Sequence, residues 1–295
     1  QKAMRENIRD RVKALRSMMS QAKLDAYILT GADPHLSEYP AARWESRTWI
    51  SGFTGSAGTI VVTKDKAGLW TDSRYFIQAE VELADTGIEL YKMGLPDTLS
   101  VEEFLFAELK KESVVGVDGS SYSATSAEHL SGLLKKKQIQ LDITQDLVGE
   151  IWKDRPTIPN KEVFAMPLSL SGVATPDKLN KIVDKVHQQG ADATLLSALD
   201  EVAWTLNVRG SDVDFNPVAV SYVYVSEEET VWFVLPEKVP AELAKLMEND
   251  GVRIVGYDAL SDFLDHLDTN KRILLDKSKT NALIYQQVSN RCEIL

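Results

Sequence analysis

The sequence predicts an α/β protein built from two similar halves. Short apolar runs of strand length alternate with amphipathic helical stretches along the whole chain of 295 residues. The order of these stretches in the first half returns in the second half. A segment with two prolines, residues 152–160, interrupts the pattern between the halves. We therefore expect two domains, residues 1–156 and 157–295, each with a mixed six-stranded sheet and helices on both faces.

The first half opens with a helix over residues 4–19, because its apolar residues recur at helical spacing. Residues 31–43 contain two prolines and no period, which predicts a long loop, and long ordered loops are often functional. Ser100 with Glu103 predicts a capping box at the start of a later helix. The expected strands are residues 25–29, 59–63, 67–71, 88–92, 114–117 and 140–143, and the expected later helices are residues 74–85, 100–111 and 126–136.

The chain is organised around residues 47–75, which contain Gly52, Gly55 and Gly58 directly before a predicted hairpin. Glycine is needed where φ is positive or where another group approaches the backbone closely. Asp72, at the end of the second hairpin strand, is a predicted N-cap for a helix that begins near Arg74. Arg74 would then lie just past a strand end, where binding crevices of α/β folds are found.

The second half repeats this order. Its opening helix begins at Thr175-Pro176 and ends at Gly190. The expected strands are residues 194–196, 218–225, 230–235, 253–257, 272–275 and 292–295, and the expected later helices are residues 197–206, 240–250, 260–267 and 280–289. The correspondences that we expect between the halves are Asp25 with Asp192, Trp49 with Trp204, Trp70 with Phe233 and Asp118 with Asp276. Four tryptophans in apolar runs are expected to lie in the cores: Trp49, Trp70, Trp204 and Trp232.

Composition excludes several classes of partner. The net charge of −11 argues against nucleic acid and against anionic membranes, which need a basic face. No apolar run approaches the ~20 residues of a membrane span. Cys292 is the only cysteine, so no internal disulfide forms, and this fits a reducing compartment such as the cytoplasm.

No catalytic constellation or metal site is expected from the spacing of residues. The four histidines are far apart, and His35, which precedes Glu38 by three positions, is expected to be polar surface. The glycine stretch lacks the lysine of a phosphate-binding loop, and Thr54 stands where a nucleophile elbow needs glycine. Asp72 and Asp212 are loop acids that we expect to cap local structure rather than to catalyse.

Eight segments of the sequence are distinctive when taken together: Ser37-Glu38-Tyr39, SGFTGSAGT at 51–59, WTDSRYF at 70–76, KMGLPDT at 92–98, VGVD at 115–118, IWKDRP at 151–156, ALDEVAW at 198–204 and NVRGSDVDFNPV at 207–218. Together they resemble one family, the three-domain cytosolic X-prolyl aminopeptidases, also called aminopeptidase P. They occur in family order and cover nearly the whole chain. The resemblance implies two successive creatinase/prolidase N-terminal-like domains, in agreement with the duplication.

The resemblance also implies that catalysis and the role of these two domains are separate. In that family a third, C-terminal domain of pita-bread fold supplies the ligands of two manganese ions, and none of those ligands has a counterpart here. We therefore expect these residues to be the non-catalytic part of a metallo-aminopeptidase that releases the N-terminal residue from X-Pro peptides. They would wall the active-site cleft, limit substrate length and help to assemble a homodimer in the cytoplasm. The alternative is a stand-alone binding module of the same fold, without peptidase activity.

The resemblance assigns roles to two residues of this chain. It implies that Arg74 reaches the bound peptide across a domain boundary, and its guanidinium fork suits a carbonyl or carboxylate. An ion pair with Asp72 or Glu80 is the other interpretation of Arg74. Glu38 is either close to the mouth of the cleft or an ordinary surface residue, and the sequence leaves both open.

Overall fold

The computed structural model describes all residues, 1–295, and divides them into two compact units. The first unit consists of Gln1–Asp33 and Glu38–Thr157, and the second consists of Pro34–Ser37 and Ile158–Leu295. The four residues Pro34–Ser37 were expected in the first domain, within a continuous loop. The structure instead groups them with the second unit, where the ring of His35 is buried against Tyr222. The domain limits at residues 156 and 157 remain our proposal.

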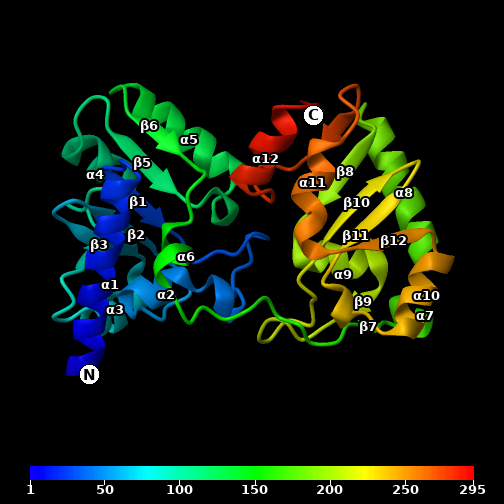
Figure 1. Cartoon of the computed structure of the whole chain (residues 1–295), viewed down its shortest axis with the longest axis horizontal. Helices are drawn as coiled ribbons and strands as arrows, with labels where there is room; N and C mark the ends of the chain where they lie inside the picture. Colours follow the sequence, from blue (N-terminus) through cyan, green and yellow to red (C-terminus); the bar gives the residue numbers. More distant parts are fainter. The chain divides into compact units, whose positions relative to one another are not determined.

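The first unit is a six-stranded mixed sheet with strand order β4-β3-β2-β1-β5-β6 (Figure 1). Its strands are β1 (Ala26–Leu29), β2 (Thr59–Thr63), β3 (Ala67–Thr71), β4 (Glu89–Lys92), β5 (Val114–Val117) and β6 (Gln140–Asp142). Strand β2 runs antiparallel to both β1 and β3, whereas the pairs β3–β4, β1–β5 and β5–β6 are parallel. Because parallel neighbours need crossover connections, helices must cover both faces of this sheet.

The helices of the first unit cover both faces, as the alternation of strand side chains requires. They are α1 (Lys2–Gln21), α2 (Ser46–Ser51), α3 (Phe76–Glu82), α4 (Val101–Glu108), α5 (Ala124–Lys135) and α6 (Leu147–Ile151). Tyr27 and Leu29 join a core with α1, α2, α3 and α6. Ala26 and Ile28, which point to the opposite face, join a second core with α4 and α5. The capping box of Ser100 and Glu103 is present at the start of α4.

The second unit contains a sheet with the equivalent strand order, β12-β11-β10-β8-β13-β14. Its strands are β8 (Ala193–Leu196), β10 (Tyr222–Ser226), β11 (Thr230–Phe233), β12 (Val252–Val255), β13 (Arg272–Leu274) and β14 (Glu293–Ile294). Its helices are α7 (Leu168–Ser171), α8 (Thr175–Gln188), α9 (Leu199–Leu206), α10 (Ala241–Asn249), α11 (Leu260–Asp265) and α12 (Ala282–Ser289). A separate antiparallel pair, β7 (Phe164–Ala165) with β9 (Val208–Arg209), was not expected.

The strand ladders show that the halves are copies of one topology. Trp70 pairs with Thr59 at the same position of the β2–β3 ladder at which Phe233 pairs with Tyr222. Strand order and direction agree throughout. The expected duplication is therefore confirmed, together with the correspondence of Trp70 and Phe233.

Two pairs of aspartates repeat even their hydrogen bonds. A side-chain oxygen of Asp25 accepts from the backbone N–H of Val114, and Asp192 accepts in the same way from Arg272, at 2.8 Å in both halves. Asp118 and Asp276 each accept from the backbone N–H and the hydroxyl of the serine two positions later. Asp118 and Asp276 close the same turn in each copy, whereas Asp25 and Asp192 bind the backbone at the start of the neighbouring parallel strand, β5 or β13.

The expectation that the tryptophans lie in the cores holds for Trp70 and Trp232, which are 1% and 0% exposed, but it is wrong for Trp204. Trp204 is 49% exposed on α9, and the Nζ atom of Lys178 lies 4.3 Å from its ring centre. Its counterpart Trp49 on α2 packs against the first core. A cation over an aromatic face stabilises a ring that remains in contact with water. The apolar residues around Trp204 in the sequence therefore did not imply that its ring is buried.

Candidate functional site

The glycine loop of residues 52–58, between α2 and β2, is packed too closely for side chains. Gly52 ends α2 with φ at 75°, a left-handed conformation that favours glycine. A Cβ atom on Gly55 would lie 2.3 Å from the ring of Phe53, and one on Gly58 would lie 3.2 Å from the carbonyl oxygen of Trp70. The glycines therefore serve both purposes that the sequence suggested, a positive φ and a close approach.

Arg47 holds this loop in place, a role that the sequence analysis missed. Its side chain is buried, its Nη1 donates to the carbonyl oxygen of Gly58 at 2.9 Å, and its Nη2 donates to that of Gly55. Burial lowers the pKa of Arg47. Gly31 leaves room for the guanidinium, because a Cβ atom there would lie 2.5 Å from Nη1. An arginine just before a glycine-rich loop was the available signal, since the loop carbonyls needed a donor.

Arg74 follows β3 and forms an ion pair with Asp72. The side chain of Asp72 accepts from the backbone N–H of Arg74, which confirms the expected cap, although a 3-10 turn at Ser73–Tyr75 precedes α3. Nε and Nη2 of Arg74 each donate to one carboxylate oxygen of Asp72 at 2.9 Å. These bonds raise the pKa of Arg74 and lower the pKa of Asp72. The alternative partner, Glu80, instead pairs with Lys92 at 2.7 Å.

The ion pair leaves much of the Arg74 side chain accessible. It is 63% exposed, and Nη1 makes no hydrogen bond within the protein. The guanidinium carbon lies 5.1 Å from the ring centre of Tyr75, whose hydroxyl contacts the Ser56 hydroxyl of the glycine loop. A planar cation fixed on one side by a carboxylate and set near an aromatic ring can still donate to a carbonyl or carboxylate ligand.

Glu38 belongs to the same part of the first unit as Arg74. Its side chain is exposed, and its charge contributes, after the larger effects of Asp72 and Tyr75, to raising the pKa of Arg74. The two predicted site residues, far apart in the sequence, are therefore electrostatic neighbours without a direct hydrogen bond between them. The fold brings the loop after β1 and the end of β3 within electrostatic range.

His35 was expected on the polar surface, and this expectation is wrong. The side chain is 3% exposed within the second unit, with its ring centre 4.2 Å from that of Tyr222. Nδ1 lies 2.8 Å from the carbonyl oxygen of Ser197, and Nε2 lies 2.7 Å from the hydroxyl of Tyr257. A carbonyl only accepts, so Nδ1 carries the proton, and in the neutral ring Nε2 accepts from Tyr257. Asn281 donates to the carbonyl oxygen of Pro34 at 2.8 Å.

Asp212 was expected to cap local structure but forms a buried ion pair instead. Its Oδ2 accepts from Nζ of Lys238 and, at 2.7 Å, from the backbone N–H of Val220. The two side chains are 1% and 0% exposed. Burial lowers the pKa of Lys238, and the bond to Asp212 opposes that effect. Because a buried charge is tolerated only with a partner, this pair fixes residues 212–220 against the segment before α10.

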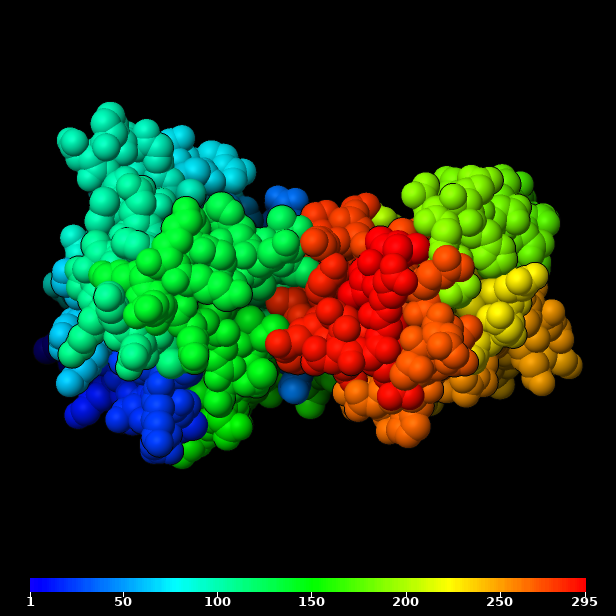
Figure 2. Space-filling model, turned by 90° about the horizontal axis from the view of Figure 1, so that it is seen from above, coloured from blue at the N-terminus to red at the C-terminus, as the bar shows by residue number.

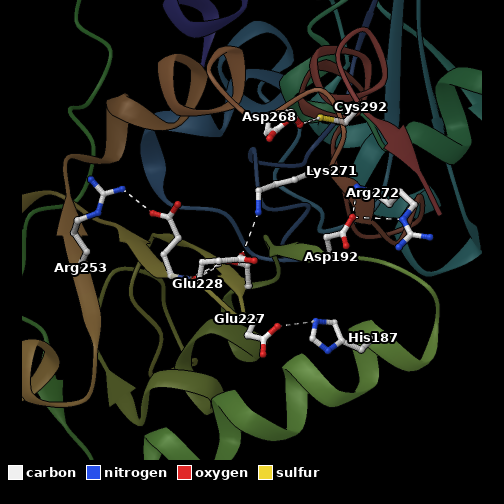
Figure 3. A network of polar contacts seen from close by, with 11 residues as sticks. His187, Asp192, Glu227, Glu228, Arg253, Asp268, Lys271, Arg272 and Cys292 are labelled. Atoms are coloured by element: carbon white, nitrogen blue, oxygen red, sulfur yellow. Dashed lines mark hydrogen bonds and ion pairs between the residues drawn. The ribbon is translucent and has the colours of Figure 1, made fainter.

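No three of the His, Cys, Asp and Glu side chains gather into a group that could hold a metal ion. The densest acidic run, Glu227–Glu229 in the turn between β10 and β11, shows why (Figure 3). The Glu228 carboxylate contacts Lys271 at 3.2 Å and the Glu229 carboxylate contacts Arg253 at 3.0 Å, while Glu227 lies 3.9 Å from His187. Each acid is directed to a different basic partner, so the three do not converge.

Comparison with known proteins gives consistent matches over both units. Residues 11–148 and residues 154–295 each match a family model described as the creatinase/prolidase N-terminal domain. Aminopeptidase P2 of Arabidopsis thaliana is 37% identical over 290 residues, which cover 96% of this chain and 41% of that protein. A probable Xaa-Pro aminopeptidase P of Coprinopsis cinerea is 37% identical over 278 residues, covering 94% of this chain and 44% of that protein.

A solved structure agrees over nearly the whole chain. It is the X-prolyl aminopeptidase of Caenorhabditis elegans, described as a cytosolic enzyme with a di-nuclear active site. The match has a TM-score of 0.89 at 31% identity and covers 97% of this chain and 49% of that one. The chain thus spans less than half the length of the relatives that it matches. None of the helices is both long and apolar enough to cross a membrane.

Proposed function

We propose that this chain, which belongs to the creatinase/prolidase N-terminal domain family, is the non-catalytic N-terminal region of an X-prolyl aminopeptidase. The chain contains two successive domains of that family. The observation that carries the proposal is the match in both sequence and structure to such enzymes over nearly all of the chain. The structural match is a single one that covers 97% of this chain and therefore includes both of its six-stranded sheets. The whole enzyme would release the first residue of peptides whose second residue is proline.

The reaction itself is assigned to residues outside this chain. A dinuclear manganese centre needs several carboxylates that converge with histidine. The residues present here do not fit such a centre, because their acidic side chains are paired with basic partners or lie apart. We therefore derive no catalytic step from this chain. Its two domains would instead wall the cleft and limit the length of the peptide that enters.

Arg74 is the residue that we propose to contact the peptide. Asp72 fixes Nε and Nη2, so the orientation of the guanidinium is set before a ligand arrives, and Nη1 remains available to a peptide carbonyl or carboxylate. Glu38 lies within electrostatic range of Arg74 and would help to hold the positive end of a peptide near the same surface.

We also propose a cellular location, a class of partner and an oligomeric state for the whole protein. The nematode enzyme is described as cytosolic, which supports a cytoplasmic location here. The net charge of −11 argues against nucleic acid or an anionic membrane as partner, and the similarity to Xaa-Pro aminopeptidases supports a peptide substrate. Assembly as a homodimer follows from the family resemblance alone.

An assay of this chain by itself tests the assignment of catalysis. The purified protein is incubated with an X-Pro peptide and added manganese, and manganese binding is measured by titration. We expect no turnover above background and no tight manganese site. Turnover that survives a second purification would refute the proposal that these two domains are non-catalytic.

A further inference from the structure

The second unit contains a cavity of about 350 Å³ that the proposed function does not use. Its walls come from the segment between β7 and α7, the start of α8, the end of α9 and the end of α10. Most of the lining is apolar and includes Met166, Leu168, Leu206 and Leu246. Small-molecule sites begin at about 300 Å³ and combine an apolar lining with a few polar groups, so the size and composition fit such a site.

Three of the four polar side chains that line the cavity are committed to the protein. Asn207 donates through Nδ2 to the carbonyl oxygen of Val173 at 2.9 Å, and its Oδ1 accepts from Lys178 at 2.6 Å. The hydroxyl of Thr175 donates to a backbone carbonyl at 3.2 Å, and that of Ser171 does so at 3.4 Å. The polar atoms of these three side chains are already hydrogen-bonded within the protein, so they have little capacity left to bind a ligand.

Asp250 is the fourth polar group and the only charged one. It follows the last residue of α10 and lies one helical turn after Leu246, so both line the same wall. A carboxylate at a helix C-terminus is repelled by the helix dipole, and no cation within the protein pairs with Asp250. Burial raises its pKa, and no neighbouring charge opposes this effect. The carboxylate of Asp250 therefore has no charged partner within the protein.

Exposed apolar side chains line the cavity or are sequence neighbours of residues that line it. Phe164, Leu168, Leu170 and Leu246 are 54%, 59%, 74% and 42% exposed. Figure 2 shows that the chain around α8 (lime green) and around α10 (gold) lies at the surface of the second unit. A group of exposed apolar residues next to a cavity is typical of a binding surface. The single carboxylate, that of Asp250, favours a ligand with a positive charge.

We propose that this cavity binds a small molecule with an apolar body and one ammonium group. The apolar body would fill the space between Leu168, Leu206 and Leu246, and the ammonium group would bind the carboxylate of Asp250. The charge complementarity favours a cation over a neutral or acidic molecule of the same shape, because a charged partner in a half-buried site forms the stronger hydrogen bond.

The test compares three probes of similar shape on the 295-residue protein at pH 7.5: 2-phenylethylamine, 2-phenylethanol and 3-phenylpropionate. Binding is followed by NMR titration. We expect the amine to bind in the millimolar range or tighter, the alcohol about tenfold or more weakly, and the carboxylate weakest. Asp250→Asn should bring the amine and the alcohol to equal affinity. Leu168→Ala should weaken both several-fold and leave their ratio unchanged.

Glu248→Gln is the matched control, because Glu248 is an exposed acid in the same last turn of α10 outside the cavity lining. It should leave the preference for the amine intact. Equal affinity of the amine and the alcohol for the unmodified protein would overturn the proposal and would indicate a purely apolar docking surface. Absence of saturable amine binding, or a preference that persists in Asp250→Asn, would overturn it too.

Discussion

At the scale of single residues, Arg74 combines a structural contact with an open donor. From the sequence, an ion pair and a substrate contact were alternative roles for Arg74. The structure shows the ion pair with Asp72, yet 63% of the Arg74 side chain remains exposed and Nη1 stays without a partner. The two roles are therefore compatible, and kinetics rather than geometry separates them.

We predict that Arg74→Ala in the full-length enzyme lowers kcat/KM by roughly 10- to 150-fold, the effect of losing a charge-assisted hydrogen bond to substrate. The melting temperature should stay unchanged, because the side chain is exposed. Arg74→Lys is the control, since it keeps the charge but loses the planar fork and should restore little activity. Unchanged kinetics in Arg74→Ala would end the substrate role, and a large fall in melting temperature would point to the ion pair with Asp72 instead.

Asp118 leads to a prediction about pH. Burial, and then the charge of Asp146, raises the pKa of Asp118 to about 6, whereas its ordinary value is 3.8. The folded state therefore binds a proton more readily than the unfolded state, and the stability linked to this group is lost as pH rises from 4 to 6. We predict that Asp118→Asn stabilises the protein above pH 6 by at most about 3 kcal/mol.

Urea unfolding at several pH values measures this effect. The advantage of Asp118→Asn over the unmodified protein should shrink as pH falls towards 4, while the hydrogen bonds from Ser120 are kept by the amide oxygen. Asp276→Asn in the other copy is the control, because the pKa of Asp276 is lowered, by its bonds from Ser278, and this variant should not stabilise at neutral pH. A pH-independent difference for Asp118→Asn would contradict the account.

The buried pair of Asp212 and Lys238 predicts a strong asymmetry between single and double substitution. Lys238→Met leaves the Asp212 charge buried without its partner and should cost about 3–5 kcal/mol of unfolding free energy. Asp212→Asn combined with Lys238→Met removes both charges and keeps an acceptor for the N–H of Val220, so it should cost less than Lys238→Met alone. Denaturant titration of both variants decides, and a double variant less stable than the single one would contradict the interpretation.

At the scale of elements, the four-residue segment Pro34–Ser37 belongs to the second unit because of buried contacts of His35. Sequence patterns do not reveal these contacts. His35 is held by Ser197, Tyr222 and Tyr257, which come from the ends of strands and their following turns. We predict that His35→Phe lowers the unfolding free energy by about 1–3 kcal/mol, because the ring still packs but the buried groups lose their partners. His129→Phe, at an exposed position of α5, is the control, and equal stability of both variants would contradict this role.

Secondary structure was largely predictable because each element carries its own signal. The apolar period of α1, the capping box of α4 and the hairpin of β2 and β3 are local features, and all three occur as expected. Strand β10 begins at Tyr222 rather than at residue 218. Residues 218–221 are buried without strand pairing, and burial alone gives the same apolar pattern as a strand.

The candidate site was less predictable, because its contacts join residues that are distant in sequence. Asp72 and Arg74 are two positions apart, so their ion pair could be foreseen as an alternative. The neighbourhood of Glu38 and Arg74, the support of the glycine loop by Arg47 and the burial of His35 depend on tertiary packing. Tertiary contacts of this kind override local propensity, which is why His35 and Trp204 were wrongly placed.

At the scale of the whole molecule, the duplication explains how one domain type gives two different surfaces. Equivalent aspartates close equivalent turns, but Asp118 is half-buried and the charge of Asp146 helps to raise its pKa, whereas Asp276 is exposed and its pKa is lowered. The apolar cavity of about 350 Å³ is formed by side chains of the second copy. The shared sheet order preserves the fold, and the side chains around it have diverged, as expected when function lies in sites rather than in the fold.

The most direct test of the central claim is the activity of the full-length protein encoded by the reading frame that contains this chain. The purified protein is assayed with manganese on an X-Pro peptide and on a matched X-Ala peptide. We predict release of the first residue from the X-Pro peptide, little from the X-Ala peptide, and loss of activity on removal of the metal with a chelator. A metal-loaded full-length protein that cleaves neither peptide, or that cleaves both equally, would contradict the claim.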